Sequence, residues 1–276
     1  DLMDIEKMVL RCIRHQEEWE FKMFRSALHK VLNDLHEQHD SIFVELVEEL
    51  LDRVALFGSH FASIDIRQDS REIKRAFDAV AHQLGLKVPT TPEELFDLDA
   101  KWDGTLTDDD RVDDTLQSFR VIREIQAKNG PKGAHPYIIS NCRGAMDVAR
   151  VFALARWTAF GDEKISVDIV PLFETIDDLM GAGASMNTLY SESNYRRHLT
   201  QRGNKQTIML GFSDGTKDGG YMSANWNIYR AKENLTRISK LNDIDVVFFD
   251  GRGASRVHLR QIEVTRSRSE GFRPLC

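Results

Sequence analysis

The chain has 276 residues, 41% of them hydrophobic and 29% charged, which is enough to build a buried core in one large domain or two ordinary ones. Its net charge of -7 excludes a general attraction for nucleic acid or for an anionic membrane surface. Three widely spaced cysteines, Cys12, Cys142 and Cys276, are typical of reduced thiols rather than of a disulfide framework, so the expected location is cytoplasmic.

The sequence shows no targeting or membrane segment. No apolar run approaches the roughly 18 residues that a transmembrane helix needs, and the first residues carry no signal-peptide pattern. We therefore expect neither export nor membrane insertion. Position 1 is Asp1 rather than Met, and we expect the natural start of the protein to lie upstream.

The first part of the chain is helical in pattern. Residues 1–53 carry apolar residues at helical spacing among many charges, which predicts two or three amphipathic helices. A short alternating run at 61–67 predicts a strand, followed by a polar turn and a helix through Leu86.

Two further helix starts carry recognisable signals. Thr91, Pro92 and Glu94 predict a helix with Thr91 as the N-cap, proline in the first turn and Glu94 closing a capping box. Three aspartates at 108–110 precede a helical stretch at 112–125, where carboxylates favour the positive end of the helix dipole.

The second half alternates between short apolar runs and helical patterns, including a long helix at 217–240. The apolar runs lie at 137–140, 165–170, 206–211 and 245–249. Buried apolar strands joined by helices predict a parallel sheet, and an α/β barrel is the commonest closed form of that arrangement.

Polar or charged residues follow each predicted strand directly. They are Arg67, Asn141, Glu174, Ser213 with Asp214, and Arg252. In a parallel barrel these side chains would converge on one rim. Two carboxylates suit a hard cation such as Mg²⁺ or Mn²⁺ with open coordination positions, and arginines suit phosphate or carboxylate groups. The set predicts a metal site beside an anionic, phosphorylated substrate.

Each of these residues also has a purely structural interpretation. Glu174 directly precedes a helix-start pattern at 175–178, and Asp214 could form a surface ion pair with Lys217. Arg67 could pair with Asp69 in the same way. Composition and spacing alone therefore support only a metal-dependent α/β enzyme.

Four blocks of the sequence resemble the phosphoenolpyruvate carboxylase family, in the same order and at similar separations. They read I-D-I-R-Q-D-S at 64–70, V-P-L-F-E-T-I-D-D-L at 170–179, M-L-G-F-S-D-G-T-K-D-G-G at 209–220 and F-D-G-R-G at 249–253. The resemblance covers residues 40–254. It implies a helix-rich parallel (β/α) barrel of the phosphoenolpyruvate/pyruvate type, incomplete in this chain.

The resemblance also implies roles for five residues. Glu174 and Asp214 match the metal-ligating acids of the family. Arg67 and Arg252 match arginines that hold phosphoenolpyruvate. Lys217 matches a lysine beside the bicarbonate and carboxyphosphate position, which makes Lys217 and Arg252 the implied catalytic residues.

The implied reaction forms oxaloacetate and phosphate from phosphoenolpyruvate and bicarbonate, through carboxyphosphate and a metal-stabilised enolate. The cofactor would be Mg²⁺ or Mn²⁺, and the role would be anaplerotic carbon fixation feeding the tricarboxylic acid cycle. By resemblance the full-length protein would be a homotetramer.

The chain also departs from the family pattern. Family members are several times longer, and their catalytic histidine lies in an upstream T-A-H-P-T motif that this chain does not reach. The A-H-P segment at 134–136 precedes a predicted strand and lacks both flanking threonines, so we interpret it as a decoy. Asp250 replaces the histidine common before G-R-G-G.

The resemblance stops abruptly after Gly253. This predicts a partial barrel domain at 1–255 and a tail at 256–276 that is disordered or arises from an altered reading frame or truncation. A catalytically inactive fragment that binds metal and anion is the alternative function, and a helical interaction module built on the first 60 residues is a third. A partial barrel exposes unpaired strand edges, which predicts a chain prone to aggregate.

Overall fold

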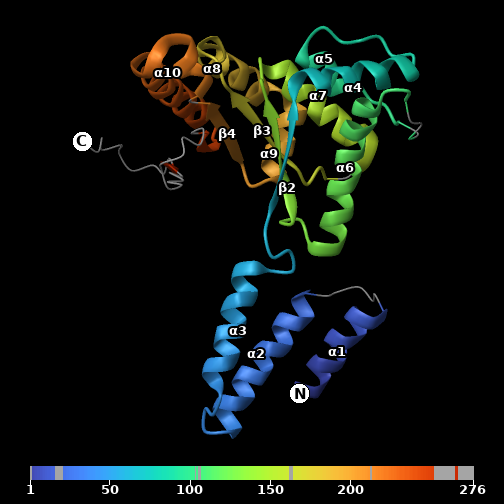
Figure 1. Ribbon diagram of the computed structural model, residues 1–276, viewed down its shortest axis with the longest axis vertical. Helices are drawn as coiled ribbons and strands as arrows, with labels where there is room; N and C mark the ends of the chain where they lie inside the picture. Colours follow the sequence, from blue (N-terminus) through green and yellow to red (C-terminus); the bar gives the residue numbers. More distant parts are fainter. Residues whose placement is uncertain are drawn as a thin grey trace. The chain divides into compact units, whose positions relative to one another are not determined.

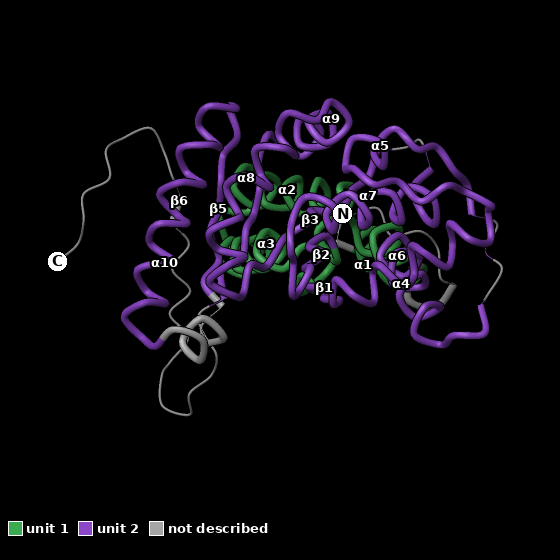
Figure 2. Tube along the Cα trace, turned by 90° about the horizontal axis from the view of Figure 1, so that it is seen from above, with its two compact units in different colours: residues 1–64, 124–134 green, residues 65–123, 135–276 purple. Residues whose placement is uncertain are grey.

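The computed structural model describes residues 2–15, 21–102, 104, 107–161, 164–211, 213–251 and 265–266, with side chains for all of these except 2, 8, 12–15, 213–219, 251 and 265–266. Two compact units divide the chain: residues 1–64 with 124–134, and residues 65–123 with 135–276 (Figure 2). Within the described ranges, no helix is long and apolar enough to cross a membrane.

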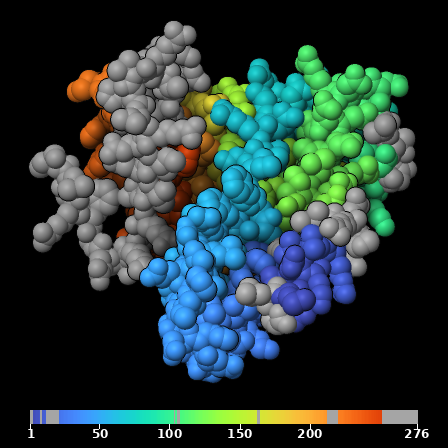
Figure 3. Space-filling view, turned by 60° about the horizontal axis from the view of Figure 1, so that its bottom comes forward, coloured from blue at the N-terminus to red at the C-terminus, as the bar shows by residue number. Residues whose placement is uncertain are grey.

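The first unit is built on three helices, which confirms the helical prediction for the start of the chain. They are α1 (Leu2–His15), α2 (Phe21–Gln38) and α3 (Val44–Phe57). Helix α2 packs against both α1 and α3, with Leu28, Val31 and Val54 buried; the atoms of these helices are blue in Figure 3. Ser59 Oγ donates to the carbonyl oxygen of Asn129 at 2.7 Å, which ties the segment 124–134 to this unit.

Among the described residues, the strands form one sheet in the order β1-β2-β3-β4-β5-β6. The first five run parallel, and β6 runs antiparallel beside β5. The predicted parallel sheet is confirmed, and the sheet is not closed into a barrel within the part of the chain that the structure describes. The strands are β1 (Ile64–Asp69), β2 (Ala134–Ser140), β3 (Asp168–Phe173), β4 (Lys205–Gly211), β5 (Asp245–Gly251) and β6 (Thr265–Arg266).

Helices alternate with these strands and cover the sheet (Figure 1). Helices α7 and α8 contact β3, α9 contacts β4, and α10 contacts both β4 and β5. Helix α9 was not predicted as a separate element. The helices are α4 (Ser70–Gln83), α5 (Pro92–Asp97), α6 (Asp110–Asn129), α7 (Ala145–Ala155) with a π-helical turn η1 (Arg156–Phe160), α8 (Ile176–Ser191), α9 (Ser193–Gln201) and α10 (Ser213–Leu241).

Two of the helix starts follow their sequence signals closely. Thr175 Oγ1 accepts from the N–H of Asp178 at 3.2 Å, and the Asp178 carboxylate accepts from the N–H of Thr175 at 3.1 Å, which completes a capping box. Thr91 caps α5 as predicted, accepting from the N–H of Glu94 at 3.3 Å. The Glu94 carboxylate, however, accepts from the N–H of Thr90 at 2.9 Å, so the predicted box of Thr91 and Glu94 is displaced by one residue.

The register of the central strands decides which face each residue occupies. Leu172 pairs with Met209, and Met209 pairs with Phe249. Leu172 and Met209 form a buried apolar cluster with Ile138 and Val170, so these residues define one face of the sheet. Because successive residues of a strand point to opposite faces, the neighbouring register row belongs to the other face.

Helix α10 is broken at Gly220. This residue has φ 79° and ψ 167°, and the helix therefore consists of two segments, 213–219 and 221–241. Residues with a Cβ rarely adopt a positive φ, so glycine suits this position. The segment before the break belongs to the M-L-G-F-S-D-G-T-K-D-G-G block at 209–220.

Candidate active site

The carboxylate of Glu174 joins the ends of three strands. Glu174 directly follows β3, and its Oε1 accepts from Nη2 of Arg67 in β1 at 3.2 Å. Its Oε2 accepts from the backbone N–H of Asn141, directly after β2, at 2.7 Å. The Glu174 side chain is 19% exposed and the Arg67 side chain 53% exposed. The structure thus brings Arg67 and Glu174 together, as the rim prediction requires, while their roles in binding stay a prediction.

The structural alternatives for these two residues are resolved differently. Asp69 pairs with Arg71, whose Nε lies 2.9 Å from Asp69 Oδ1, and this interaction lowers the pKa of Asp69. Arg67 is thus held by Glu174 rather than by Asp69. The helix-start pattern after Glu174 is real, but Thr175 forms it, which leaves the Glu174 carboxylate to the strand ends.

Strand β4 approaches Glu174 closely through Gly211. A Cβ atom added at Gly211 would lie 3.0 Å from the Glu174 Cα and 3.2 Å from its Cγ. The missing side chain at Gly211 therefore allows the end of β4 to pack beside Glu174.

The loop after β2 supports the Glu174 junction. Ser70 Oγ donates to the carbonyl oxygen of Asn141 at 2.7 Å, and Arg143 Nη1 lies 3.3 Å from the buried Asp178 Oδ1. Burial raises the pKa of the Cys142 thiol, so Cys142 is a packing residue rather than a thiolate nucleophile. Sequence reasoning did not assign Ser70 or Arg143 to the site, although Ser70 ends the I-D-I-R-Q-D-S block and Arg143 lies shortly after β2.

Asp250 lies on the face of the sheet opposite to the apolar cluster of Leu172 and Met209. It pairs in register with Leu210, which pairs with Phe173, one row away from the apolar cluster that contains Leu172. Its Oδ2 accepts from Nζ of Lys232 in α10 at 2.8 Å. The residue at position 250 therefore faces the helix layer.

The A-H-P segment lies at the other end of the strands. His135 is inside β2, not before the strand as predicted, and its Nδ1 lies 2.8 Å from Asp168 Oδ2. Arg202 Nε donates to Asp168 Oδ1 at 2.5 Å. Burial alone would raise the pKa of Asp168, but the hydrogen bonds from His135 and Arg202 outweigh it and lower that pKa to about 2. Asp168 begins β3 and Glu174 follows its end, about 20 Å along the strand.

Three of the predicted site residues are not fully described. Asp214 and Lys217 lie in the first segment of α10, which follows β4, but their side chains lie outside the described residues. Arg252 also lies outside them. The predicted metal role of Asp214 and the catalytic roles of Lys217 and Arg252 therefore stay predictions.

The Glu174 carboxylate has oxygen lone pairs left that could bind a divalent cation. An ionised carboxylate offers about four acceptor positions, and Glu174 uses two of them for Arg67 and Asn141. Oxygen ligands therefore remain for a hard cation. Among the described residues, no group of three or more His, Cys, Asp or Glu could hold a metal ion.

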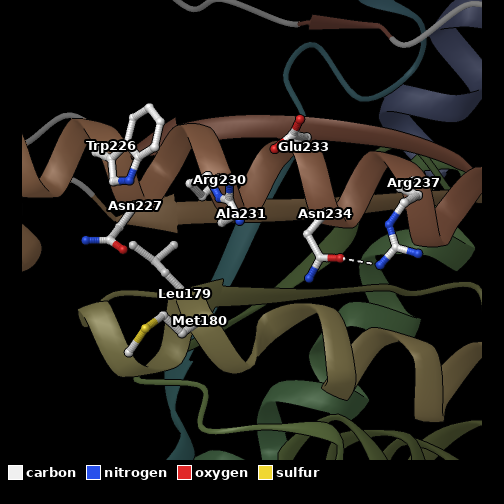
Figure 4. A pocket seen from close by; sticks show the side chains of 9 residues that line it. All are labelled: Leu179, Met180, Trp226, Asn227, Arg230, Ala231, Glu233, Asn234 and Arg237. Carbon is white, nitrogen blue, oxygen red and sulfur yellow. Dashed lines mark hydrogen bonds between the residues drawn. The ribbon is translucent and has the colours of Figure 1, made fainter.

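A groove of about 670 Å³ runs between α8 and α10. In Figure 4, Trp226, Arg230, Asn234 and Arg237 lie along α10 above Met180 of α8, and Arg237 donates to Asn234. No residue that lines this groove was predicted to belong to the site.

These features define an α/β protein that gathers charged groups at the carboxyl ends of parallel strands, where enzymes of this architecture keep their active sites. The family model for phosphoenolpyruvate carboxylase matches residues 10–256. The chain therefore belongs to the phosphoenolpyruvate carboxylase family.

Individual relatives support the same assignment. The phosphoenolpyruvate carboxylase of Gloeobacter violaceus is 32% identical over 226 residues, and that of Xanthomonas campestris pv. campestris is 36% identical over 226 residues. The phosphoenolpyruvate carboxylase of Prochlorococcus marinus is 33% identical over 235 residues. The first two alignments cover 76% of this chain and 24% of the relative, so the chain spans about a quarter of the length of these relatives.

Proposed function

We propose that this chain forms part of the catalytic barrel of a phosphoenolpyruvate carboxylase, which makes oxaloacetate and phosphate from phosphoenolpyruvate and bicarbonate. The observation that supports this most is the junction of Arg67, Glu174 and the Asn141 N–H at the carboxyl ends of three parallel strands. Five parallel strands in chain order also support the proposal that the sheet belongs to a barrel of the phosphoenolpyruvate/pyruvate type.

Arg67 is suited to bind an anionic substrate without leaving Glu174. A guanidinium has five N–H donors, and one nitrogen of Arg67 contacts Glu174 while about half of the side chain remains exposed. The free donors can form paired hydrogen bonds with phosphate or carboxylate. In this proposal Arg67 and Arg252 together hold phosphoenolpyruvate.

The remaining roles follow from charge. Glu174 and Asp214 would hold Mg²⁺ or Mn²⁺, which when bound supplies positive charge beside the oxyanions of the substrate. Lys217 would orient bicarbonate through its ammonium group. The Asn141 N–H, by binding Oε2 of Glu174, keeps that carboxylate in one orientation.

A narrower candidate is that the chain binds metal and anion without turnover. It needs only the residues at the strand ends, and the Arg67–Glu174 contact already combines an anion-binding group with a cation-binding group. Turnover separates the two candidates, because both require the same binding residues.

The test is Mn²⁺ titration of the chain and of Glu174→Gln and Asp214→Asn, followed by a bicarbonate-dependent oxaloacetate assay on the same samples. Glu93→Gln is the matched control, because Glu93 is an exposed carboxylate in the first turn of α5. We expect Mn²⁺ binding that needs Glu174 and Asp214 but not Glu93. Oxaloacetate formation supports the carboxylase, and binding without oxaloacetate supports the narrower candidate. Binding by a folded chain that is unchanged in both site variants contradicts the site assignment.

A further inference from the structure

The ion pair between Lys232 and Asp250 connects helix α10 to the end of strand β5. Lys232 Nζ lies 2.8 Å from Asp250 Oδ2, and the two side chains are only 26% and 16% exposed. The ammonium also lies 6.0 Å from the centre of the Phe248 ring, within the range of a cation–π contact. Lys232 is thus held against two residues of the same strand.

Asp250 is otherwise poorly satisfied. Its Oδ1 is buried and has no hydrogen-bond partner among the residues that the structure describes. A carboxylate in this position is costly unless a cation compensates it, and loss of that cation would leave a charge with little water around it. Lys232 therefore supplies the cation that compensates the Asp250 carboxylate.

One residue, Gly251, separates Asp250 from Arg252 along the chain. Gly251 is the last residue of β5, and it pairs in register with Gly211, whose backbone approaches Glu174. A displacement of the Asp250 backbone would therefore also displace Gly251, which joins Asp250 to Arg252.

We propose that Lys232 is a positioning residue, which fixes the carboxyl end of β5 through Asp250 and thereby sets the place of Arg252 relative to Glu174. Lys232 does not touch the substrate, because it lies on the helix side of the sheet. The inference rests on the proposed function for the role of Arg252, while the anchoring of β5 is independent of it.

The anchoring is tested by hydrogen exchange on the full chain. In Lys232→Met we expect the backbone amides of residues 246–251 to exchange roughly tenfold faster, and in Lys232→Arg, which keeps the cation, to stay within about twofold of the parent. Lys74→Met is the control, because Lys74 forms an ion pair with Asp78 on the surface of α4. Unchanged exchange at 246–251 in Lys232→Met overturns the proposal.

The positioning role is tested by comparing two ligands. We expect Lys232→Met to weaken phosphoenolpyruvate binding roughly tenfold and to leave Mn²⁺ affinity within about twofold, since Arg252 is proposed to hold phosphoenolpyruvate and not the metal. Phe119→Leu, which disturbs the ring stack of Phe119 on Tyr137 far along the chain, controls for a general loss of stability. Equal weakening of both ligands in Lys232→Met contradicts a role through Arg252.

The outcome also separates this inference from the proposed function. If the parent chain binds no phosphoenolpyruvate, the proposed function fails, yet the exchange experiment still decides whether Lys232 anchors β5. A further variant, Asp250→His, introduces the family's common residue and removes the carboxylate that Lys232 binds. We expect it to behave like Lys232→Met, and parent-like exchange together with parent-like phosphoenolpyruvate binding would refute the proposal.

Discussion

Arg67 and Glu174 lie 107 positions apart in the chain, and their side chains meet at 3.2 Å across the ends of β1 and β3. The contact is between an exposed arginine and a largely buried carboxylate. A pair of this kind contributes little to stability, because water still solvates the guanidinium. Its value in the proposed function lies in the free donors of the arginine.

Arg67→Met should therefore separate binding from stability. We expect the urea midpoint to change by less than about 1 kcal/mol in equivalent free energy, while phosphoenolpyruvate binding is lost. Arg71→Met is the matched control, because Arg71 pairs with Asp69 at the same end of β1. Titration calorimetry and urea unfolding of the three proteins measure both quantities. A loss of binding in both variants would point to the local charge rather than to Arg67.

Gly211→Ala should disturb the site from the opposite side. The added methyl would lie 3.0 Å from the Glu174 Cα, which is tighter than nine in ten real Cβ contacts, so β4 or Glu174 must give by a few tenths of an ångström. We expect roughly tenfold weaker Mn²⁺ binding, since metal ligands require accurate placement. Gly181→Ala serves as the control, because nothing in the described part of the chain lies within 4 Å of the added methyl there. Mn²⁺ affinity equal in both variants would show that β4 tolerates the side chain.

Gly220→Ala should cost stability because of backbone conformation alone. No atom of the described residues lies within 4 Å of the added methyl, but φ is 79°. Because φ 79° with ψ 167° is a backbone conformation that almost only glycine adopts, we expect a loss of about 1–3 kcal/mol, measured by urea unfolding. The same substitution at Gly181, inside α8, should instead stabilise the protein by roughly 0.5–1 kcal/mol. A Gly220→Ala variant as stable as the parent would mean that the break in α10 straightens without penalty.

Asp168 should make the stability of the second unit depend on acid pH. Its pKa is about 2 in the folded chain against about 3.9 in a free peptide, so the ionised form stabilises the fold above pH 4, and the effect is lost as pH falls toward 2. We expect Asp168→Asn to lose roughly 2 kcal/mol at pH 7 and to approach the parent near pH 2.

Denaturant unfolding at a series of pH values measures this difference. Asp245→Asn provides the control, because Asp245 is exposed at the start of β5. A constant gap between the parent and Asp168→Asn from pH 7 to pH 2 would contradict the pKa assignment.

Local sequence signals predicted much of the fold. Thr175 and Thr91 cap helices because their hydroxyls accept from free N–H groups three residues later. Such a cap can be recognised from a segment of only four residues. The apolar runs at β2 to β5 predicted strands because a sheet covered by helices needs continuous apolar segments. A strand that is buried on both faces shows no alternation of apolar and polar residues. Its sequence therefore does not predict which face of the sheet each residue occupies.

The less predictable features depend on contacts between distant segments. Glu174 accepts from the backbone N–H of Asn141. The identity of a side chain does not predict a hydrogen bond made by the backbone. Lys232 and Asp250 are separated by 18 positions and belong to different elements, so no spacing rule joins them. Helix α9 follows α8 almost directly, and only Glu192, whose carboxylate accepts from the N–H of Asn194, marks its start.

The orientation of position 250 has a consequence for how distant members of this family are detected. A pattern that demands histidine before G-R-G would reject this chain for a residue that packs against a helix. The residue at position 250 pairs with the residue at position 232 of α10. Positions 232 and 250 should therefore be compared together across the family. A chain with an acid at 250 and a base at 232 forms an ion pair between α10 and the end of β5.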